Sequence, residues 1–371
     1  MQDRASEDPR DFSDAEMNAR LVRTREVMAA HEIDALCLTG EHNVRYVSGF
    51  RGEPRRLLIT QSEVVVYTGL RTEPWARAQT TGIEVSTAAD ALGDIADRLA
   101  GKGVKTIGVE RSVTHLAYQG IQEQFSEYDV RVSTAVETAR MVKSATEISY
   151  MRTAQEMAER VLSGTLPEIK PGVTERFIRG RIRSRIAEIE QADDCAFGPL
   201  IIAGGNAWEV HHKPDFRKVE PGDFIIIDMG VRYRGYNSDM SRTLCVGAPT
   251  DEMRRVYATV KAAQEKAFAA IRAGECNHAV DVAARDHIEA AGYDEFFTHG
   301  LGHSIGLEVH DPLLGFGKAQ SEDTLEAGMV MTVEPGIYLE GEFGVRIEDV
   351  VVVTDDGCEN LVSFERDLIM L

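Results

Sequence analysis

Residues 225–243 of the chain read IIIDMGVRYRGYNSDMSRT, and the rest of the sequence is organised around this stretch. The run Ile225–Ile227 is β-branched and is closed by a polar residue, which is typical of the end of a buried strand. Arg234 and Gly235 indicate a turn, and the residues from Ser241 onward predict the returning strand. We therefore expect a β-hairpin.

Two aspartates lie on the arms of this predicted hairpin. Asp228 and Asp239 are equally far from the point between Tyr233 and Arg234. We therefore expect them to face each other, with Cβ atoms about 5 Å apart. Two ionised carboxylates at that distance repel, and a shared proton or a bound cation would relieve the repulsion. Taken alone, the pair is also compatible with an ordinary turn, where aspartate is common.

The chain has 371 residues, of which 41 are basic and 61 acidic, giving a net charge of −20. This length predicts about two domains. The acidic balance, without a basic stripe, disfavours nucleic-acid binding. The cysteines are odd in number and form no CxxC pair, which favours reduced thiols in a cytoplasmic protein. No apolar signal core or spanning run is present, so no membrane association is expected.

The periodicity of apolar residues divides the chain into two predicted domains. Residues 1–138 alternate predicted helices and strands, which indicates an α/β domain. Within it, residues 1–13 are expected to be disordered, and residues 43–50 are expected to form a strand. Residues 139–371 predict long helices grouped beside a largely antiparallel sheet, which is the α+β class.

Further polar residues gather in the C-terminal half. Three histidines lie within His299–His310, interleaved with glycines that would let the backbone approach a bound group. Histidine is a common metal ligand near neutral pH. Glu334 ends an apolar run, where a buried carboxylate is costly unless it is paired. Arg346 and Glu348 would share one face of a strand, and this pair is also compatible with a structural salt bridge.

Glu334 and Glu348 are symmetric about Gly341, so a second hairpin would bring two more carboxylates together. Two carboxylate pairs and a histidine make a ligand set of mixed oxygen and nitrogen type. Such a set suits two divalent metal ions, such as Mn, Co, Fe or Zn. Two ions about 3.5–4 Å apart can activate a water molecule and polarise a carbonyl.

With these motifs, the chain resembles the pita-bread metallopeptidase family, which includes methionine aminopeptidase, Xaa-Pro aminopeptidase, prolidase and the metal-free relative creatinase. The resemblance covers nearly the whole chain, including the segment Asn43–Phe50, and is closest to the prolidase and Xaa-Pro aminopeptidase branch. It implies a creatinase-like N-terminal domain over residues 1–138 and a pita-bread catalytic domain over residues 139–371. The metal ligands that it implies are Asp228, Asp239, His303, Glu334 and Glu348.

The resemblance also implies roles for histidines outside the ligand set. A family histidine that lies 17 residues before the first ligand corresponds to His211, although His212 is adjacent. His299 and His310 match two histidines that bind substrate and stabilise the transition state. In the mechanism implied by the family, His310 or His211 stabilises the oxyanion.

Three other residues take their implied roles from the same resemblance. Tyr338 matches a tyrosine near the site, and Arg346 matches an arginine that supports the metal-bound glutamate. The family mechanism implies that a hydroxide bridging the two metal ions attacks the carbonyl before a proline nitrogen, while Glu334 transfers the proton.

The chain departs from the family pattern at some positions. Ser241 stands where threonine is usual and keeps the hydroxyl. No arginine lies between His310 and Glu334, where prolidases often hold the carboxylate of a dipeptide, and this disfavours strict dipeptidase activity. Arg55 and Arg56 are unusual, and one hypothesis is that they hold a substrate carboxylate across a dimer. A solvated surface pair is the alternative.

The leading functional prediction is a dinuclear metal hydrolase that cleaves Xaa-Pro bonds in dipeptides or short peptides. Manganese is the favoured metal, and the resemblance implies a homodimer. One alternative is a family member that acts on another small carboxylate-bearing molecule, as an ectoine-type or creatine-type hydrolase or a sulfonium carboxylate lyase. The other is an inactive binding module, against which the intact ligand set argues.

Overall fold

The computed structural model describes residues 10–317 and 323–371, so most of the segment predicted to be disordered lies outside the described residues. The chain falls into two compact units, Met1–Arg140 and Met141–Leu371. Each unit has its own hydrophobic core. Within the described ranges, no helix is long and apolar enough to cross a membrane.

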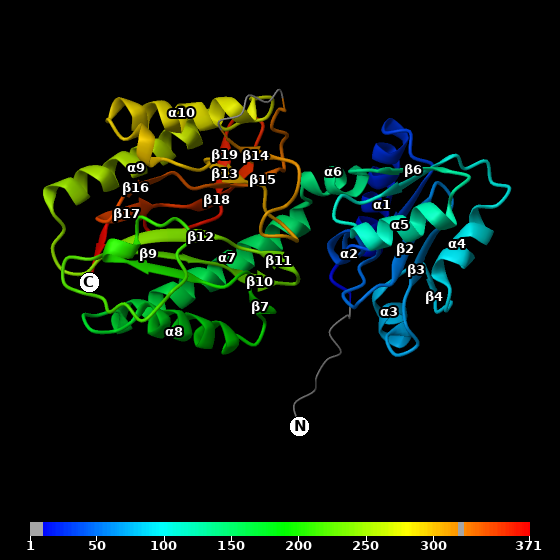
Figure 1. The fold of residues 1–371 in the computed structure, drawn as a ribbon, viewed down its shortest axis with the longest axis horizontal. Helices are drawn as coiled ribbons and strands as arrows, with labels where there is room; N and C mark the ends of the chain where they lie inside the picture. Colours follow the sequence, from blue (N-terminus) through cyan, green and yellow to red (C-terminus); the bar gives the residue numbers. More distant parts are fainter. Residues whose placement is uncertain (1–9, 318–322) are drawn as a thin grey trace. The chain divides into compact units, whose positions relative to one another are not determined.

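Helices and strands alternate along the N-terminal unit, which confirms the predicted α/β class (Figure 1). The strands form a mixed sheet in the order β4-β3-β2-β1-β5-β6, and α4 and α5 pack against one face of it. The helices are α1 (Asp14–Ala30), α2 (Glu41–Ser48), α3 (Glu73–Gln79), α4 (Ala91–Leu99), α5 (His115–Gln124) and α6 (Ala135–Met141). The strands are β1 (Ala35–Leu38), β2 (Arg56–Thr60), β3 (Val64–Tyr67), β4 (Glu84–Ser86), β5 (Thr106–Val109) and β6 (Asp129–Val132).

The prediction of a strand over residues 43–50 is wrong, because helix α2 occupies most of that segment. Its buried positions, which include Val44, Val47 and Ser48, follow helical rather than alternating spacing. Gly49 ends the helix in the left-handed region at φ +75°, a conformation that glycine adopts without strain. A short apolar run of this kind is ambiguous between helix and strand in sequence alone.

The C-terminal unit combines long helices with several small sheets. The helices are α7 (Ala145–Thr165), α8 (Glu175–Ala187), α9 (Asp251–Ala270) and α10 (Asn277–Ala290). The strands are β7 (Asp194–Cys195), β8 (Leu200–Ala203), β9 (Phe224–Met229), β10 (Val231–Tyr233), β11 (Tyr236–Asn237), β12 (Met240–Cys245), β13 (Gly302–His303), β14 (Gly315–Phe316), β15 (Val330–Val333), β16 (Gly336–Leu339), β17 (Phe343–Arg346), β18 (Asp349–Val353), β19 (Cys358–Asn360) and β20 (Ile369–Met370).

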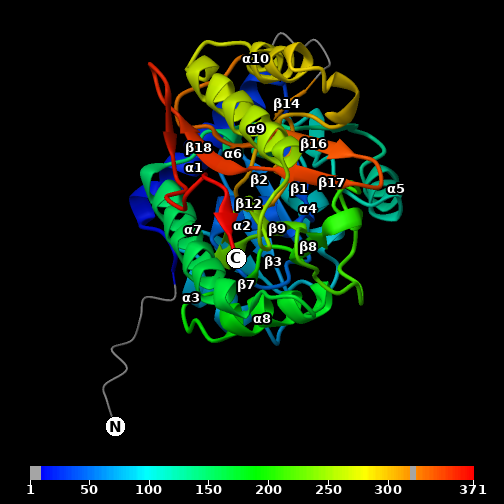
Figure 2. The same cartoon turned by 90° about the vertical axis from the view of Figure 1, so that its left-hand side faces the viewer.

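The strands of this unit lie between two pairs of helices (Figures 1 and 2). Apolar side chains of α7 and α8 pack with those of β8, β9 and β12 in one core. Those of α9 and α10 pack with β15, β16, β17 and β18 in a second core. Nearly all described strand pairs of the unit are antiparallel, the β12–β20 pair being parallel. The predicted α+β class is therefore confirmed.

The first predicted hairpin forms, but its register differs from the expected one. Arg234 and Gly235 are the two central residues of the turn, at φ +46° and +75°, and two-residue hairpin turns with both φ values positive are common. The centre of the hairpin therefore lies one residue later than predicted, and Asp228 pairs with Ser241. Asp239 is thus a diagonal neighbour of Asp228, at about 7–8 Å for such pairs, and not its direct partner.

The second predicted hairpin has the expected register. Strands β15 and β18 pair Val333 with Asp349, and strands β16 and β17 pair Gly336 with Arg346. Both ladders are symmetric about Gly341, at φ +73° in the connecting loop. Glu334 and Glu348 lie in the short break between the two ladders, where a carboxylate can leave the sheet and face a ligand.

Candidate metal centre

The predicted metal ligands converge on one cavity of about 370 Å³ in the C-terminal unit. They reach it from the first hairpin, from β13 and from the break in the second hairpin. The lining of this cavity includes Asp228, Asp239, His303, Glu334 and Glu348.

The distances between these groups are short enough for several of them to bind one cation. His303 Nε2 lies 3.5 Å from Glu334 Oε1 and 3.9 Å from Asp239 Oδ2. One potential ligand atom from each of Asp239, His303 and Glu348 lies within 4.8 Å of the other two. Carboxylate oxygens and an imidazole nitrogen at such spacing suit Mn, Co, Fe or Zn.

Two fully buried carboxylate oxygens of the site have no hydrogen-bond donor among the described residues. They are Asp228 Oδ1 and Asp239 Oδ1, and both are buried. Buried polar atoms normally have a partner, because burial without one is costly. This set of metal-ligand atoms therefore fits divalent metal ions, which would give both oxygens a partner.

The electrostatics of the cavity disfavour negative charge on its carboxyl groups, a cost that a proton or a cation would reduce. Burial raises the pKa of Asp228, Asp239, Glu334 and Glu348, because the charged forms lose their hydration. The pKa of Glu334 rises to about 8. For Asp239 and Glu348, neighbouring carboxylates add to burial and raise the pKa values well above their ordinary range. Burial lowers the pKa of His303 to about 4. Its imidazole is then neutral, which is the form that binds a metal.

Arg346 is the buried cation of the site, and its ion-pair partner is not the one predicted. The sequence suggests a pair with Glu348, whereas Arg346 Nη2 donates to Asp228 Oδ2 at 2.7 Å. The hydroxyl of Ser241 lies between Arg346 and Glu348 and connects them by hydrogen bonds. Its Oγ accepts from Arg346 Nε at 2.9 Å and donates to Glu348 Oε2 at 2.7 Å. Arg346 Nη1 also donates to the hydroxyl of Tyr338 at 3.1 Å.

His299 lines the cavity and contacts Tyr338. Burial lowers the pKa of His299 to about 4, so the ring is neutral. Its Nδ1 lies 2.7 Å from the carbonyl oxygen of Gly300, which can only accept. We therefore assign the proton to Nδ1, and Nε2 accepts from the Tyr338 hydroxyl at 2.9 Å. Both ring nitrogens of His299 then have partners, and its Nε2 orients the hydroxyl of Tyr338.

The other two predicted histidines, His211 and His310, lie on the cavity lining. The rings of His310 and His303 have centroids 4.0 Å apart. Burial is the main cause that lowers the pKa of His310. His212 turns to different partners, with Nδ1 2.8 Å from Glu209 Oε2, so His211 is the member of the adjacent pair that faces the cavity.

Glu175, which the sequence analysis did not select, orders the loop that carries His211. It is fully buried at the start of α8 and accepts from the backbone N–H groups of Ala203 at 2.8 Å and Asp215 at 3.0 Å. The carboxylate also lies near His212, so these groups resemble a second metal cluster. Because both Glu175 oxygens already accept from N–H donors, we interpret this cluster as structural: it holds the segments around Ala203 and Asp215 against α8.

Apolar residues that form a wall of the cavity also escaped the sequence analysis. They are Phe197, Leu200, Val210 and Val309. The available signal was the pairing of Leu200 with Asp228 in the β8–β9 ladder, which requires β8 to be recognised as a strand. Gly302 lies on the cavity lining, as the predicted role requires, and it has a further role, because a Cβ on it would lie 2.0 Å from the carbonyl oxygen of Thr332. It permits close strand contact.

Arg55 and Arg56 lie in the N-terminal unit at the start of β2. The backbone N–H of Arg55 donates to Tyr67, and Arg56 Nη1 lies 4.0 Å from Cys37 Sγ. Neither residue is part of the described lining of the cavity. The structure contains one chain, so a role across a dimer stays a prediction.

Two family models match the chain. The model for metallopeptidase family M24 matches residues 149–355, and the model for the creatinase/prolidase N-terminal domain matches residues 20–142. Among curated proteins, the Xaa-Pro dipeptidase of Pyrococcus horikoshii is 32% identical over 362 residues, which cover 95% of this chain and 99% of that protein.

Solved structures of the same kind superpose on nearly the whole chain. An Xaa-Pro dipeptidase from Bacillus anthracis matches with a TM-score of 0.91 and 32% identity, covering 96% of this chain and 100% of that one. An X-Pro aminopeptidase from Thermotoga maritima matches with a TM-score of 0.85 and 32% identity, covering 95% and 99%. The similarity therefore includes proteins with either of the two named activities.

Proposed function

The chain belongs to metallopeptidase family M24, and on this premise we propose that it cleaves the Xaa-Pro bond of dipeptides or short peptides with two divalent metal ions. The observation that carries the proposal is the cavity lined by four carboxylates and a neutral imidazole. Two of those carboxylates, Asp228 and Asp239, have buried oxygens without a described donor. The relatives named as Xaa-Pro dipeptidases and X-Pro aminopeptidase support the choice of substrate.

The proposed ligands are Asp228, Asp239, His303, Glu334 and Glu348, and manganese is the first metal to test. When bound, two divalent ions would polarise the scissile carbonyl and bring the pKa of a water molecule close to neutrality. The unit Met141–Leu371, which contains all five residues, is the proposed catalytic domain.

The remaining steps belong to side chains of the cavity. Glu334 would accept a proton from the attacking water and pass it to the leaving nitrogen. His310 and His211 lie on the lining with no described contact that fixes both ring nitrogens, so either can donate an N–H to the oxyanion. His299 would keep Tyr338, and through it Arg346, in place. The apolar wall would exclude bulk water and receive the substrate side chain.

A substrate carboxylate would need a further cation, because the guanidinium of Arg346 is already bound to Asp228, Ser241 and Tyr338. We propose that Arg55 or Arg56 supplies it from a neighbouring subunit of a homodimer. The requirement applies to dipeptides, whose carboxylate lies next to the scissile bond. It does not apply to longer peptides.

The proposal is tested by product release from the manganese-loaded protein, followed by mass spectrometry. The substrates are Xaa-Pro dipeptides beside Xaa-Pro-Yaa tripeptides, and Xaa-Ala peptides are the matched control. We expect hydrolysis of Xaa-Pro substrates, with dipeptide cleavage indicating a prolidase and tripeptide cleavage an aminopeptidase. Metal binding without cleavage of any peptide would refute the proposal and favour a non-peptide substrate.

A further inference from the structure

Arg242 contacts the backbone of one proposed metal ligand, Glu348, and is almost completely buried. Its side chain is 1% exposed, and that of its ion-pair partner Asp349 is 0% exposed. In sequence, Arg242 follows Ser241 and Asp349 follows Glu348. The pair therefore follows directly, in sequence, the residue that carries the Glu348 carboxylate and the residue whose hydroxyl donates to it.

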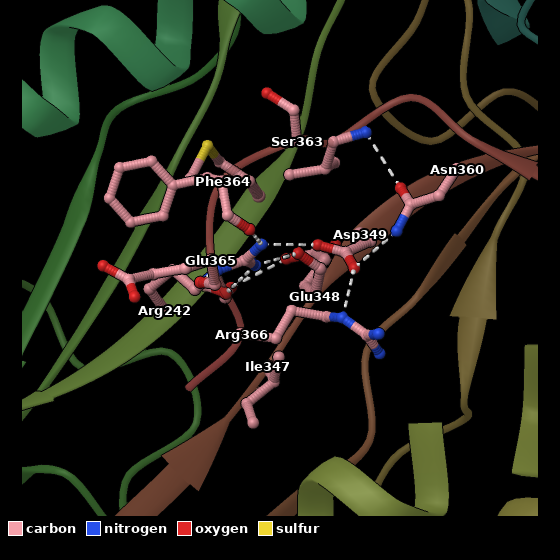
Figure 3. Close-up of polar contacts among 12 residues, drawn as sticks. Arg242, Ile347, Glu348, Asp349, Asn360, Ser363, Phe364, Glu365 and Arg366 are labelled. Carbon is pink, nitrogen blue, oxygen red and sulfur yellow. Dashed lines mark hydrogen bonds and ion pairs between the residues drawn. The ribbon is translucent and has the colours of Figure 1, made fainter. Parts of the chain in front are cut away.

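Every N–H of the Arg242 guanidinium has an acceptor (Figure 3). An arginine side chain carries five N–H donors in a fixed planar fork. The distances lie between 2.7 and 2.9 Å. The acceptors are the carbonyl oxygens of Ser241, Glu348, Phe364 and Glu365, and Oδ1 of Asp349.

These contacts hold a place where regular sheet pairing is interrupted. Strand β17 ends at Arg346 and strand β18 begins at Asp349, so Glu348 lies between them. An isolated bridge joins Glu348 to Ser241, in which the N–H of Glu348 donates to the carbonyl of Ser241 at 3.1 Å. Arg242 Nη1 donates to both carbonyl groups of this bridge.

The orientation of Arg242 is itself fixed from the C-terminal segment. Asp349 Oδ2 accepts from Asn360 Nδ2 at 2.8 Å, which holds the carboxylate that faces Arg242. The carbonyl groups of Phe364 and Glu365 complete the enclosure (Figure 3). The fork thus joins β12, the break before β18 and the segment that follows β19.

We propose that Arg242 is a positioning residue of the metal centre, which fixes the Ser241–Glu348 bridge and thereby the direction of the Glu348 carboxylate. The inference rests on the proposed metal function of Glu348. Metal sites tolerate little displacement of a ligand, and loss of outer partners typically lowers metal affinity about 10–100-fold. Arg242 touches no ligand carboxylate, so its effect passes through the backbone.

The test compares Arg242→Lys with Arg366→Lys in the full chain. Lysine keeps the charge but carries its donors on a single nitrogen, so it cannot span five separated acceptors. Arg366 is a matched control, because its Nε lies 3.8 Å from the same Asp349 carboxylate and it donates to Gln264. Calorimetric titration with Co²⁺ and the visible spectrum of bound Co²⁺ are the readouts, beside thermal unfolding of the metal-free proteins.

We expect Arg242→Lys to weaken Co²⁺ binding about 10–100-fold and to change the Co²⁺ spectrum. Arg366→Lys should keep the wild-type affinity and spectrum. A lower unfolding temperature in Arg242→Lys with unchanged affinity and spectrum would overturn the inference, because a purely structural role predicts that result. If Arg242→Lys does not fold, Asp349→Asn is judged by the same two readouts.

Failure of this inference is distinguishable from failure of the proposed function. Wild-type protein that binds no Co²⁺ would refute the metal centre and the role of Arg242 together. Wild-type binding with an unaffected Arg242→Lys variant would refute the role of Arg242 and leave the metal centre standing.

Discussion

Replacing Ser241 with alanine removes the hydroxyl that links the guanidinium of Arg346 to Glu348, a proposed metal ligand. The Ser241 side chain is fully buried. It donates to Glu348 at 2.7 Å and accepts from Arg346 at 2.9 Å. A hydrogen bond to a charged group contributes about 1.5–3 kcal/mol and a neutral one about 0.5–1.5 kcal/mol. The guanidinium of Arg346 is charged, whereas the raised pKa of Glu348 favours its neutral form in the metal-free protein. Loss of both bonds should therefore lower the free energy of unfolding of the metal-free protein by about 2–4.5 kcal/mol, as measured by urea denaturation.

The same substitution should weaken metal binding. Without the hydroxyl, the Glu348 carboxylate loses the donor that sets its orientation, and such losses typically cost about 10–100-fold in affinity. Calorimetric titration with Mn²⁺ measures this change, and the Mn²⁺ concentration that gives half-maximal peptidase activity should rise by a similar factor.

Ser241→Thr is the matched control, because threonine keeps the hydroxyl and is the residue expected at this position from the family resemblance. Its Mn²⁺ affinity should stay near that of the wild type, whatever the added methyl group does to packing. The reasoning would be refuted by a Ser241→Ala variant with wild-type Mn²⁺ affinity and an unfolding free energy within about 0.5 kcal/mol of the wild type, the range of inconsequential substitutions.

Three further predictions follow from the site. The folded metal-free protein holds more protons than the unfolded chain because the carboxyl pKa values are raised, so its free energy of unfolding should fall with rising pH by about 1.4 kcal/mol per unit for each titrating group. For Glu334 the window runs from 4.5 to about 8, but below about 6.5 the lowered pKa values of His299 and His303 act in the opposite direction. The fall should therefore be measured between pH 6.5 and about 8, and a flat profile there in denaturant titrations with a chelator present would contradict it. Asp228→Asn should abolish peptidase activity and reduce bound metal, measured by elemental analysis, with an unchanged circular dichroism spectrum; full activity would show that the site is misassigned. The double variant Arg55→Ala/Arg56→Ala should raise the KM for an Xaa-Pro dipeptide about 10-fold or more with little change in kcat, and an unchanged KM would remove the proposed carboxylate clamp.

The two hairpins show how far residue spacing determines the geometry of the site. Symmetric counting about Gly341 gives the observed register, because that glycine is the middle of its loop. In the first hairpin the centre lies between Arg234 and Gly235, so counting from one residue earlier pairs the wrong positions. The error shifts the register by two residues. Such a shift keeps side chains on the same face, so Asp228 and Asp239 still reach the same cavity.

The contacts of Arg346 could not be read from its own strand. Residues two apart on a strand share a face, and this suggested Glu348 as the partner. The observed acceptor is Asp228, which comes from a strand more than a hundred positions earlier. Whether β17 lies beside β9 depends on how separate sheets pack, and no local pattern encodes that packing. The apolar wall of the cavity was not predicted for a related reason. In sequence, Leu200 and Val309 look like ordinary core residues, and the pairing of Leu200 with Asp228 is a signal only once β8 is recognised as a strand.

The predicted ligand set rests partly on residue spacing and partly on the resemblance to a known family. Spacing alone indicated two pairs of carboxylates. It left open whether a shared proton, a bound cation or a salt bridge reduces the repulsion within each pair. The resemblance to a family selected His303 among three nearby histidines. The comparisons confirm the family and the pita-bread fold, while the roles of the individual residues stay predictions.

The raised carboxyl pKa values and the unpartnered oxygens of Asp228 and Asp239 have a single physical cause. The fold places four carboxylates, two of them almost fully buried, beside one guanidinium, and the raised pKa values show that ionising all four is unfavourable without another positive charge. Protons supply that charge in the metal-free protein, and divalent ions would supply it in the active one. Both compete for the same oxygen atoms, so metal binding must release protons and strengthen as pH rises. The buried carboxylates that raise one another's pKa values are therefore the same groups that would make the cavity bind metal.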